Sequence, residues 1–352
     1  MTCRANILWK QFTDQPTHFF KIRIFTTNKR TYMHVTQHLE QRKKTLVSLE
    51  ITPPEKGHSI QVIYDAIDRL MPFNPSFINV TYHQQRIVYE EVNGVIVKIP
   101  KRKKPGTVGI CTALANRYRV ETVPHLICGG FNRYETEDAL IDLQYLGFEN
   151  LFVIRGDPPP DYKGFLPEPE GHHHACQLVE QIAHLNRGQY LENLDDAIPT
   201  NFCMGVAGYP EKHYEAPNLA DDIRNLKSKV DQGASYILTQ MVFSAELFES
   251  FVKKAREAGI TVPIIPGIKV MVNRDQLTSI PRDFYVSLPE KLVDTIKQHD
   301  DKAAARQAGI DFTARLCQDL IDLDVPCLHF YTLGKTSATA EVMKQLKEKQ
   351  LI

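Results

Sequence analysis

Several residues that can carry proton-transfer or phosphate-binding chemistry stand at the ends of short apolar segments of this chain. Glu50 lies near the end of segment 46–52, and Arg155 lies at the end of segment 151–156. A glutamate carboxyl has a reference pKa of about 4.3, so Glu50 could act as a general acid near neutral pH if burial raised it by ~2 units. Arg155 and Lys229 are cations available for a pyrophosphate. These residue types point to acid–base chemistry beside a phosphate-bearing ligand.

A second group of polar residues follows the segment that ends at Tyr209. After Tyr209-Pro-Glu-Lys-His213 comes a predicted helix with an apolar stripe at Leu219, Ile223, Leu226 and Val230. Asp222, Asn225 and Lys229 form a second stripe, which could hold the sugar hydroxyls and phosphates of a nucleotide. The alternative is an ordinary solvated helix face. The chain has no GxGxxG fingerprint, so a Rossmann-type phosphate cradle is excluded and a nucleotide site would have to be built from other loops.

The elements that must position these residues alternate regularly along the chain. Eight apolar segments are predicted strands: 46–52, 77–82, 122–128, 151–156, 202–209, 236–241, 262–268 and 327–333. Helical patterns lie between and after them, near 58–71, 108–119, 135–146, 173–187, 217–232, 244–258, 288–321 (broken) and 337–349. Gly147, Gly233 and Gly259 end three of these helices shortly before the next strand. Eight consecutive strand–helix units favour an α/β fold with a single (β/α)8 TIM barrel.

The alternation of side chains predicts where the chemistry gathers. In segment 46–52, Val47, Leu49 and Ile51 share one face of the strand, so we expect them to pack under the helices. Glu50 then faces the barrel axis near the carboxyl end. Polar residues occupy the same end of six of the eight strands, and in a barrel these ends converge on one mouth. We expect the reactive site there, although any single residue of this kind could simply mark the point where a strand becomes a loop.

Composition divides the chain into two unlike parts. The chain has 42 Lys+Arg and 42 Asp+Glu, but residues 1–32 hold six basic residues and one acid. We expect residues 1–44 to be an N-terminal extension and lead-in helix, with 1–32 outside the fold, and residues 45–352 to form the barrel. A targeting segment is the alternative for residues 1–32. The neutral total argues against nucleic-acid binding.

Other features indicate a cytoplasmic protein without a metal centre. The seven cysteines form no CxxC pair and no apolar run reaches the ~18–20 residues of a membrane span, so we expect reduced thiols and no membrane. The tract His172-His173-His174 has no Cys or carboxylate partner at ligand spacing, and we expect no metal there. We interpret the basic run in residues 98–106 as a solvated loop, with binding of a polyglutamate tail or nucleic acid as the alternative.

The motifs of the predicted strands also resemble those of a known family. They occur in the order and approximate spacing of the methylenetetrahydrofolate reductases, over about Leu46 to Leu333. The strings are Val47-Ser-Leu-Glu-Ile-Thr-Pro-Pro54, Asn79-Val-Thr-Tyr82, Pro124-His-Leu126, Arg155-Gly-Asp157, Tyr209-Pro-Glu211, Leu238-Thr-Gln240, Pro266-Gly-Ile268 and His329-Phe-Tyr-Thr-Leu333. The resemblance implies a barrel that holds FAD without a covalent bond. It also implies hydride transfer from NADH or NADPH through FAD to 5,10-methylenetetrahydrofolate, giving 5-methyltetrahydrofolate for methionine synthesis.

The resemblance assigns roles residue by residue. It makes Glu50 the general acid that protonates the folate, places Asp157 between flavin and pterin, and gives Gln240 a folate or nicotinamide contact. Residues matching cofactor-binding positions are Thr81, His125, Arg155, Gly156, Asp157, His174, Ala175, Tyr209, His213, Asp222, Asn225 and Lys229. Gln276 and Ile280 join Glu50, Asp157 and Gln240 as substrate-binding residues. The resemblance further implies small-molecule partners and a homo-oligomer.

The sequence also departs from the family pattern. Ser228 stands where many relatives have a second basic residue, His174 replaces a frequent Tyr, and Ile280 lies where an aromatic residue can cover the nicotinamide. Two other functions stay open beside the reductase. One is a flavin-free, folate-dependent one-carbon transferase, and the other is a catalytically silent barrel that binds folate or flavin.

Overall fold

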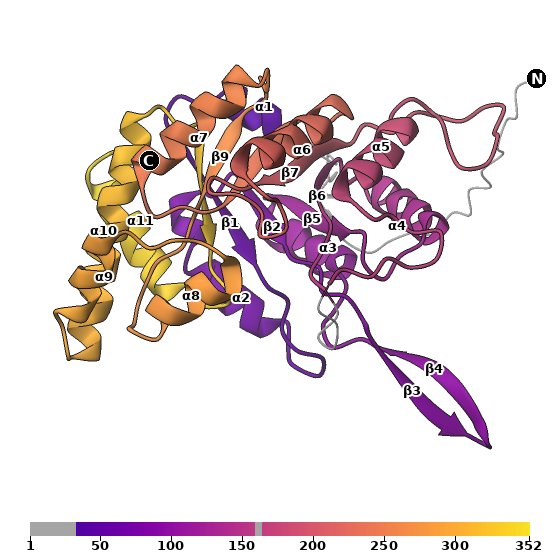
Figure 1. The fold of residues 1–352 in the computed structure, drawn as a ribbon, viewed down its shortest axis with the longest axis horizontal. Coiled ribbons are helices and arrows are strands. Elements are labelled where there is room, and N and C mark those ends of the chain that lie inside the picture. Colours follow the sequence, from indigo (N-terminus) through magenta and orange to yellow (C-terminus); the bar gives the residue numbers. More distant parts are fainter. Residues whose placement is uncertain (1–32, 159–163) are drawn as a thin grey trace, which may run out of the picture. The chain divides into compact units, whose positions relative to one another are not determined.

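The described part of the protein is a closed barrel of eight parallel strands surrounded by helices (Figure 1). The computed structural model describes residues 33–158 and 164–352; the predictions for residues 1–32 lie outside this range. Around the ring the strands are β1 (Leu46–Ile51), β2 (Phe77–Val80), β5 (Glu121–Ile127), β6 (Asn150–Ile154), β7 (Cys203–Gly208), β8 (Tyr236–Met241), β9 (Ile264–Ile268) and β10 (Cys327–Tyr331). Pairing of β1 with β10, in which Glu50 lies opposite Tyr331, closes the ring. The TIM-barrel prediction is confirmed.

Helices follow the strands as the sequence pattern predicts. They are α2 (Gln61–Asp68), α3 (Thr107–Tyr118), α4 (Arg133–Tyr145), α5 (Ala175–Leu185), α6 (Leu219–Asp231), α7 (Ala245–Glu257), α8 (Gln276–Phe284), α9 (Glu290–Lys297), α10 (Lys302–Asp322) and α11 (Ser337–Glu348). The predicted break within 288–321 separates α9 from α10, and the Asp301 side chain caps α10 by accepting a hydrogen bond from Ala304 N. Sequence reasoning missed α8, a nine-residue helix that contains Pro281.

Each barrel strand serves two separate cores. On β1, Val47, Leu49 and Ile51 are buried in the large core between strands and helices, as the alternation predicts. The opposite faces build a smaller core inside the barrel, which includes Phe77, Val123, Phe152, Tyr236 and Leu238. Gly205 faces the Tyr236 ring so closely that a Cβ would overlap it, so only glycine fits there. Glu50 therefore points into the barrel, above this inner core.

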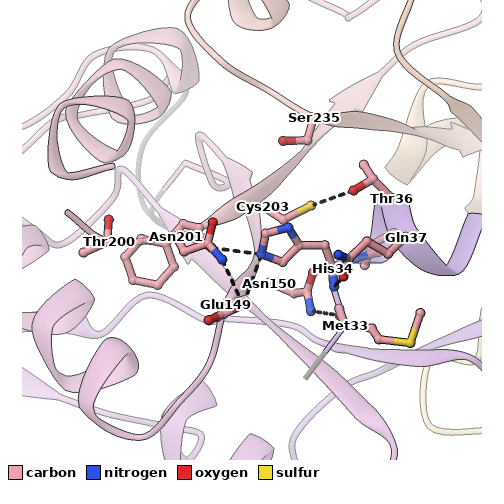
Figure 2. A network of polar contacts seen from close by, with 12 residues as sticks. Met33, His34, Thr36, Gln37, Glu149, Asn150, Thr200, Asn201, Cys203 and Ser235 are labelled. Atoms are coloured by element: carbon pink, nitrogen blue, oxygen red, sulfur yellow. Dashed lines mark hydrogen bonds and ion pairs between the residues drawn. The ribbon is translucent and has the colours of Figure 1, made fainter. Parts of the chain in front are cut away.

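A short helix closes the end of the barrel opposite the mouth. Helix α1 (Val35–Glu40) buries Val35 and Leu39 in the inner core. Asn150 at the start of β6 accepts a hydrogen bond from Val35 N at 2.8 Å and donates one to Met33 O at 2.9 Å. His34 Nε2 lies 3.0 Å from Asn201 O, and Figure 2 shows these groups converging on the helix from separate strands and loops. Residues 33–40 are thus tied to the barrel floor by both apolar and polar contacts.

A β-hairpin replaces part of the predicted loop after β2. Strands β3 (Arg86–Val92) and β4 (Val95–Lys101) pair antiparallel and project away from the barrel in Figure 1. The interpretation of residues 98–106 as a loop is therefore wrong for 98–101, which lie in β4. Asn93 and Gly94 both have positive φ angles, 52° and 77°, as a tight two-residue hairpin turn requires.

No helix in residues 33–158 and 164–352 combines the length and apolar character needed to cross a bilayer.

Candidate functional site

A buried carboxyl lies at the mouth of the barrel. Glu50 is 8% exposed, and its Oε2 is 3.5 Å from Nε2 of His125 on β5. Burial raises the pKa of Glu50 to about 8, although the positive charge of Lys269 acts in the opposite direction. Burial likewise lowers the pKa of His125 to about 3. Near pH 7 both groups are therefore neutral, and their contact is polar rather than an ion pair. A neutral carboxyl in this place can give a proton to a bound molecule.

The wall of this site includes Asn79 and a cation that the sequence analysis missed. Asn79 on β2 is fully buried, and its Nδ2 lies 3.3 Å from His125 Nε2. Lys269 follows β9 directly and is 6% exposed. Burial lowers the pKa of Lys269 to about 8. A lysine immediately after an apolar strand is the same signal that singled out Glu50 and Arg155, so this residue could have been identified.

A cavity of about 310 Å³ opens beside β6 and β7, under α5 and α6. Eight residues predicted to bind FAD line it: Arg155, His174, Ala175, Tyr209, His213, Asp222, Asn225 and Lys229. Ser228 also lines the cavity, so the cavity wall lacks the second basic residue that many relatives have at this position. The two stripes of α6 thus face different surroundings. Ile223 and Leu226 of the apolar stripe are buried in the core, whereas the polar stripe lines the cavity.

The cavity lining holds two cations, Arg155 and Lys229, and two acids, Glu215 and Asp222. Burial lowers the pKa of Lys229 to about 8 against the opposing effect of Asp222, and its Nζ donates to Ala207 O. Asp222 Oδ2 accepts a hydrogen bond from His213 N at 3.0 Å, and burial raises the pKa of Asp222. Burial and nearby Arg155 lower the pKa of His213 to about 4, so this imidazole is neutral. Lys229 is consequently the partly buried cation placed to meet an anionic ligand.

Arg155 reaches the cavity with its charge already paired. Its Nη1 lies 2.6 Å from Oε2 of Glu215, a residue that sequence reasoning missed. The guanidinium also lies 5.0 Å from the centre of the Phe165 ring. The hydrogen bond from Arg155 lowers the pKa of Glu215. A phosphate group bound by Arg155 would therefore have to share it with, or displace, the Glu215 carboxylate.

Two predicted residues, Asp157 and Thr81, lie outside the lining of this cavity. Asp157 is exposed, and its charge acts on His83 and on Tyr209. Thr81 Oγ1 lies 3.0 Å from His83 Nε2. Thr81 therefore contacts the His83 imidazole, and the charge of Asp157 acts on the same imidazole.

Four other predicted residues are occupied by local contacts. Gly156 has φ 89°, a backbone conformation that favours glycine. Gln240 Oε1 accepts a hydrogen bond from Met241 N at 3.0 Å, and Gln276 Oε1 accepts one from Val272 N at 2.6 Å. Ile280 is 4% exposed and packs in the hydrophobic core. Gln240 also lines a small pocket with Tyr209, and Gln276 lines a cavity with Lys269.

The His172–His174 tract does not form a metal-binding group. His172 is buried and its Nε2 lies 2.6 Å from Gln181 Oε1. Throughout the described residues, no three His, Cys, Asp or Glu side chains are grouped in a way that could hold a metal ion.

Comparison with known proteins finds relatives that match most of this chain. The methylenetetrahydrofolate reductase family profile matches residues 34–347. Methylenetetrahydrofolate reductase 1 of Schizosaccharomyces pombe is 30% identical over 311 residues, which cover 88% of this chain and 47% of that protein. The 5,10-methylenetetrahydrofolate reductase of Escherichia coli is 28% identical over 301 residues, covering 85% of this chain and 90% of that protein. The chain spans about half the length of its fungal and nematode relatives.

A solved structure of lower sequence identity also supports the fold. It is an uncharacterized protein from Clostridium thermocellum that binds two copies of 5-methyl-5,6,7,8-tetrahydrofolic acid. Its TM-score is 0.56 at 13% identity, covering 89% of this chain and 98% of that one. The family profile includes all eight barrel strands together with Glu50 and the cavity under α5 and α6. The chain therefore belongs to the methylenetetrahydrofolate reductase family.

Proposed function

We propose that this protein reduces 5,10-methylenetetrahydrofolate to 5-methyltetrahydrofolate, with NADH or NADPH as reductant and FAD as carrier. The observation that carries the proposal is a carboxyl whose pKa is raised to about 8 by burial, in a barrel that also holds a cavity lined by Asp222, Asn225 and Lys229. A reductase of this substrate needs an acid that is protonated at neutral pH, and Glu50 meets that requirement. The product would supply methyl groups for methionine synthesis.

The chemistry of the cavity fits a flavin nucleotide. Lys229 supplies a cation for a phosphate, and Asn225 and Asp222 lie one and two helical turns away with groups that can bind ribose hydroxyls. Tyr209 and His213 form an edge-to-face pair, with ring centres 4.8 Å apart, that can border an aromatic ring. When bound, FAD would accept a hydride from the nicotinamide and pass it to the folate. Arg155, His174 and Ala175 complete the residues that would hold it.

Glu50 would act on the folate rather than on the reductant. Its proton would pass to the folate nitrogen that is released as the five-membered ring opens, leaving a reactive iminium carbon. His125 is neutral and 3.5 Å away, so it can orient the Glu50 carboxyl without removing its proton. Asp157 and Gln240 are proposed to contact the pterin, and Gln276 the remainder of the folate.

The test separates the two half-reactions. The protein purified from flavin-replete cells is expected to be yellow and to release FAD on denaturation. Stopped-flow mixing with NADH or NADPH should bleach the flavin, and 5,10-methylenetetrahydrofolate should restore its colour. Glu50→Gln is expected to keep flavin reduction and to lose folate reduction, whereas the exposed Glu249→Gln on α7 should keep both.

Three outcomes would contradict the proposal or its parts. A colourless protein that turns over folate points to the flavin-free transferase. A yellow protein that transfers no hydride to folate is the silent binder. Folate reduction by Glu50→Gln at the original rate would remove Glu50 as the acid while leaving the reductase itself intact.

A further inference from the structure

Lys269 and Glu50 lie in one row across three neighbouring strands. Glu50 of β1 is in register with Tyr331 of β10, and Phe330 of β10 is in register with Ile268 of β9. Lys269, the next residue after β9, therefore continues the row that contains Tyr331 and Glu50. The pleat turns Lys269 to the same side as Gly267, whose Cα faces the Tyr331 ring inside the barrel. Lys269 also lines a cavity of about 180 Å³ together with Gln276, Arg306 and Lys335.

The ammonium of Lys269 is held against the strand that separates it from Glu50. Its Nζ donates to Tyr331 O at 3.3 Å and lies 3.5 Å from Thr332 O. Thr332 in turn donates from Oγ1 to Glu50 O at 2.7 Å and from its backbone N at 3.3 Å. The Tyr331 carbonyl and the Thr332 amide belong to one peptide unit and point in opposite directions, so the ammonium lies on the β9 side of β10. Strand β10 therefore separates the ammonium from the Glu50 backbone, and the charge of Lys269 acts on the Glu50 carboxyl across it. Removal of water from around Lys269, which is 6% exposed, strengthens this charge's effect on Glu50.

The other groups around Glu50 cannot supply a positive charge. His125 on β5 is the nearest titratable neighbour, and burial keeps it neutral with a pKa of about 3. Asn79 on β2 does not titrate. The phenol of Tyr331 on β10 is neutral, because burial and Glu50 raise its pKa. Lys335, in the loop after β10, acts on Lys269 and lowers its pKa, and His83, after β2, acts on His125.

We propose that Lys269 is a positioning residue whose ammonium stabilises the Glu50 carboxylate that forms when Glu50 gives its proton to the substrate. This inference rests on the proposed function. In the step, the O–H bond of Glu50 breaks and the proton joins the folate nitrogen. The bond from that nitrogen to the one-carbon unit breaks, and its electron pair stays on the nitrogen. Positive charge ends on the iminium carbon–nitrogen unit and negative charge on Glu50, one strand away from Lys269.

The proposal predicts two effects of opposite sense. Without the ammonium, Glu50 holds its proton more tightly, so proton donation slows while the acid form persists to higher pH. Lys269→Met and Lys269→Gln remove the charge, and Gln keeps a donor for the carbonyls of Tyr331 and Thr332. Lys269→Arg keeps the charge, and Lys344→Met removes an exposed charge from α11 as the control. Single-turnover reoxidation of the reduced flavin by 5,10-methylenetetrahydrofolate is followed across pH.

We expect Lys269→Met and Lys269→Gln to lower the maximal reoxidation rate tenfold or more and to move its alkaline limb up by about one pH unit. Lys269→Arg and Lys344→Met should leave the limb in place, and flavin reduction by NAD(P)H should be unchanged in all four variants. A lower rate with an unmoved limb, or the same loss in Lys269→Arg, would overturn the proposal in favour of a purely structural role.

An infrared titration keeps this test separate from the proposed function. The carboxyl band that Glu50→Gln removes identifies Glu50, and its pH midpoint should rise by about one unit in Lys269→Met. An unmoved midpoint refutes the role of Lys269 whether or not the protein reduces folate. A wild-type protein whose flavin is never reoxidised by folate refutes the proposed function, whatever the infrared midpoint does.

Discussion

Replacement of Glu50 by glutamine is expected to stabilise the protein while abolishing folate reduction. Burial raises the pKa of Glu50 from an ordinary 4.5 to about 8. A carboxyl whose folded-state pKa is raised favours folding most below pH 4.5, and that contribution is lost as pH rises toward 8. A glutamine side chain does not ionise, so the stability of the variant does not fall with pH in this way. Wild type and variant should therefore diverge in stability between pH 4.5 and 8.

The size of the divergence follows from the pKa difference. One pKa unit corresponds to about 1.4 kcal/mol, so linkage predicts a loss of about 1 kcal/mol at pH 5 and about 3 kcal/mol at pH 7 for the wild type. From pH 5 to pH 7, the free energy of unfolding of Glu50→Gln should therefore rise by about 2 kcal/mol relative to that of the wild type. Below pH 8 Glu50 is mostly protonated, so the variant gives up no ion pair with Lys269.

Urea unfolding at a series of pH values measures this directly. Both proteins are unfolded from pH 5 to pH 8 at matched flavin content, and the difference in unfolding free energy is plotted against pH. Glu249→Gln, an exposed site on α7, should follow the wild type throughout. A difference that stays constant over this range would refute the reasoning, because it would mean that Glu50 does not titrate with a raised pKa.

Three further outcomes follow from contacts described above. Lys229→Met should lower the FAD retained on purification at least tenfold through loss of the cavity's cation, whereas Lys227→Met on the same helix should retain it; equal retention would contradict the assignment. Asn150→Ala removes two hydrogen bonds to the chain around α1 and should cost about 1–3 kcal/mol of unfolding free energy, read from urea midpoints. A chain that begins at Met33 should keep its flavin content and folate reduction, and a large loss of either would show that residues 1–32 serve the enzyme.

The barrel could be predicted because local signals and global topology agree in this chain. Each strand is a short apolar segment bounded by turn residues, and the alternation on β1 separates Val47, Leu49 and Ile51 from Glu50 as the structure does. The gathering of polar residues at strand ends predicted a site at the barrel mouth, and two of those residues, Arg155 and Tyr209, line the cavity beside β6 and β7. Residues of the predicted α6 stripe reached that cavity together because a helix holds positions three and four apart on one face.

The parts that sequence reasoning missed depend on contacts between distant segments. The pairing of Arg155 with Glu215 joins two loops and leaves no periodic trace. Helix α8 is short and contains Pro281, which weakens its helical pattern. The hairpin had a usable signal in Asn93-Gly94, but its strands lack a clean alternation because nearly all their residues are exposed.

The floor of the barrel bears on the order in which the chain can complete its fold. Helix α1 leaves the ribosome before the barrel strands, yet Asn150 lies 115 residues beyond the Val35 amide it binds, and Asn201 lies 167 residues beyond His34. Strand β1 must wait still longer, since Cys327 of its partner β10 pairs with Leu46. Contacts this far apart in sequence slow folding, because a long loop must close before they form. Helix α1 and strand β1 are thus synthesised early, but their partner segments are synthesised much later. In the interval, their apolar side chains are exposed and need other protection from aggregation.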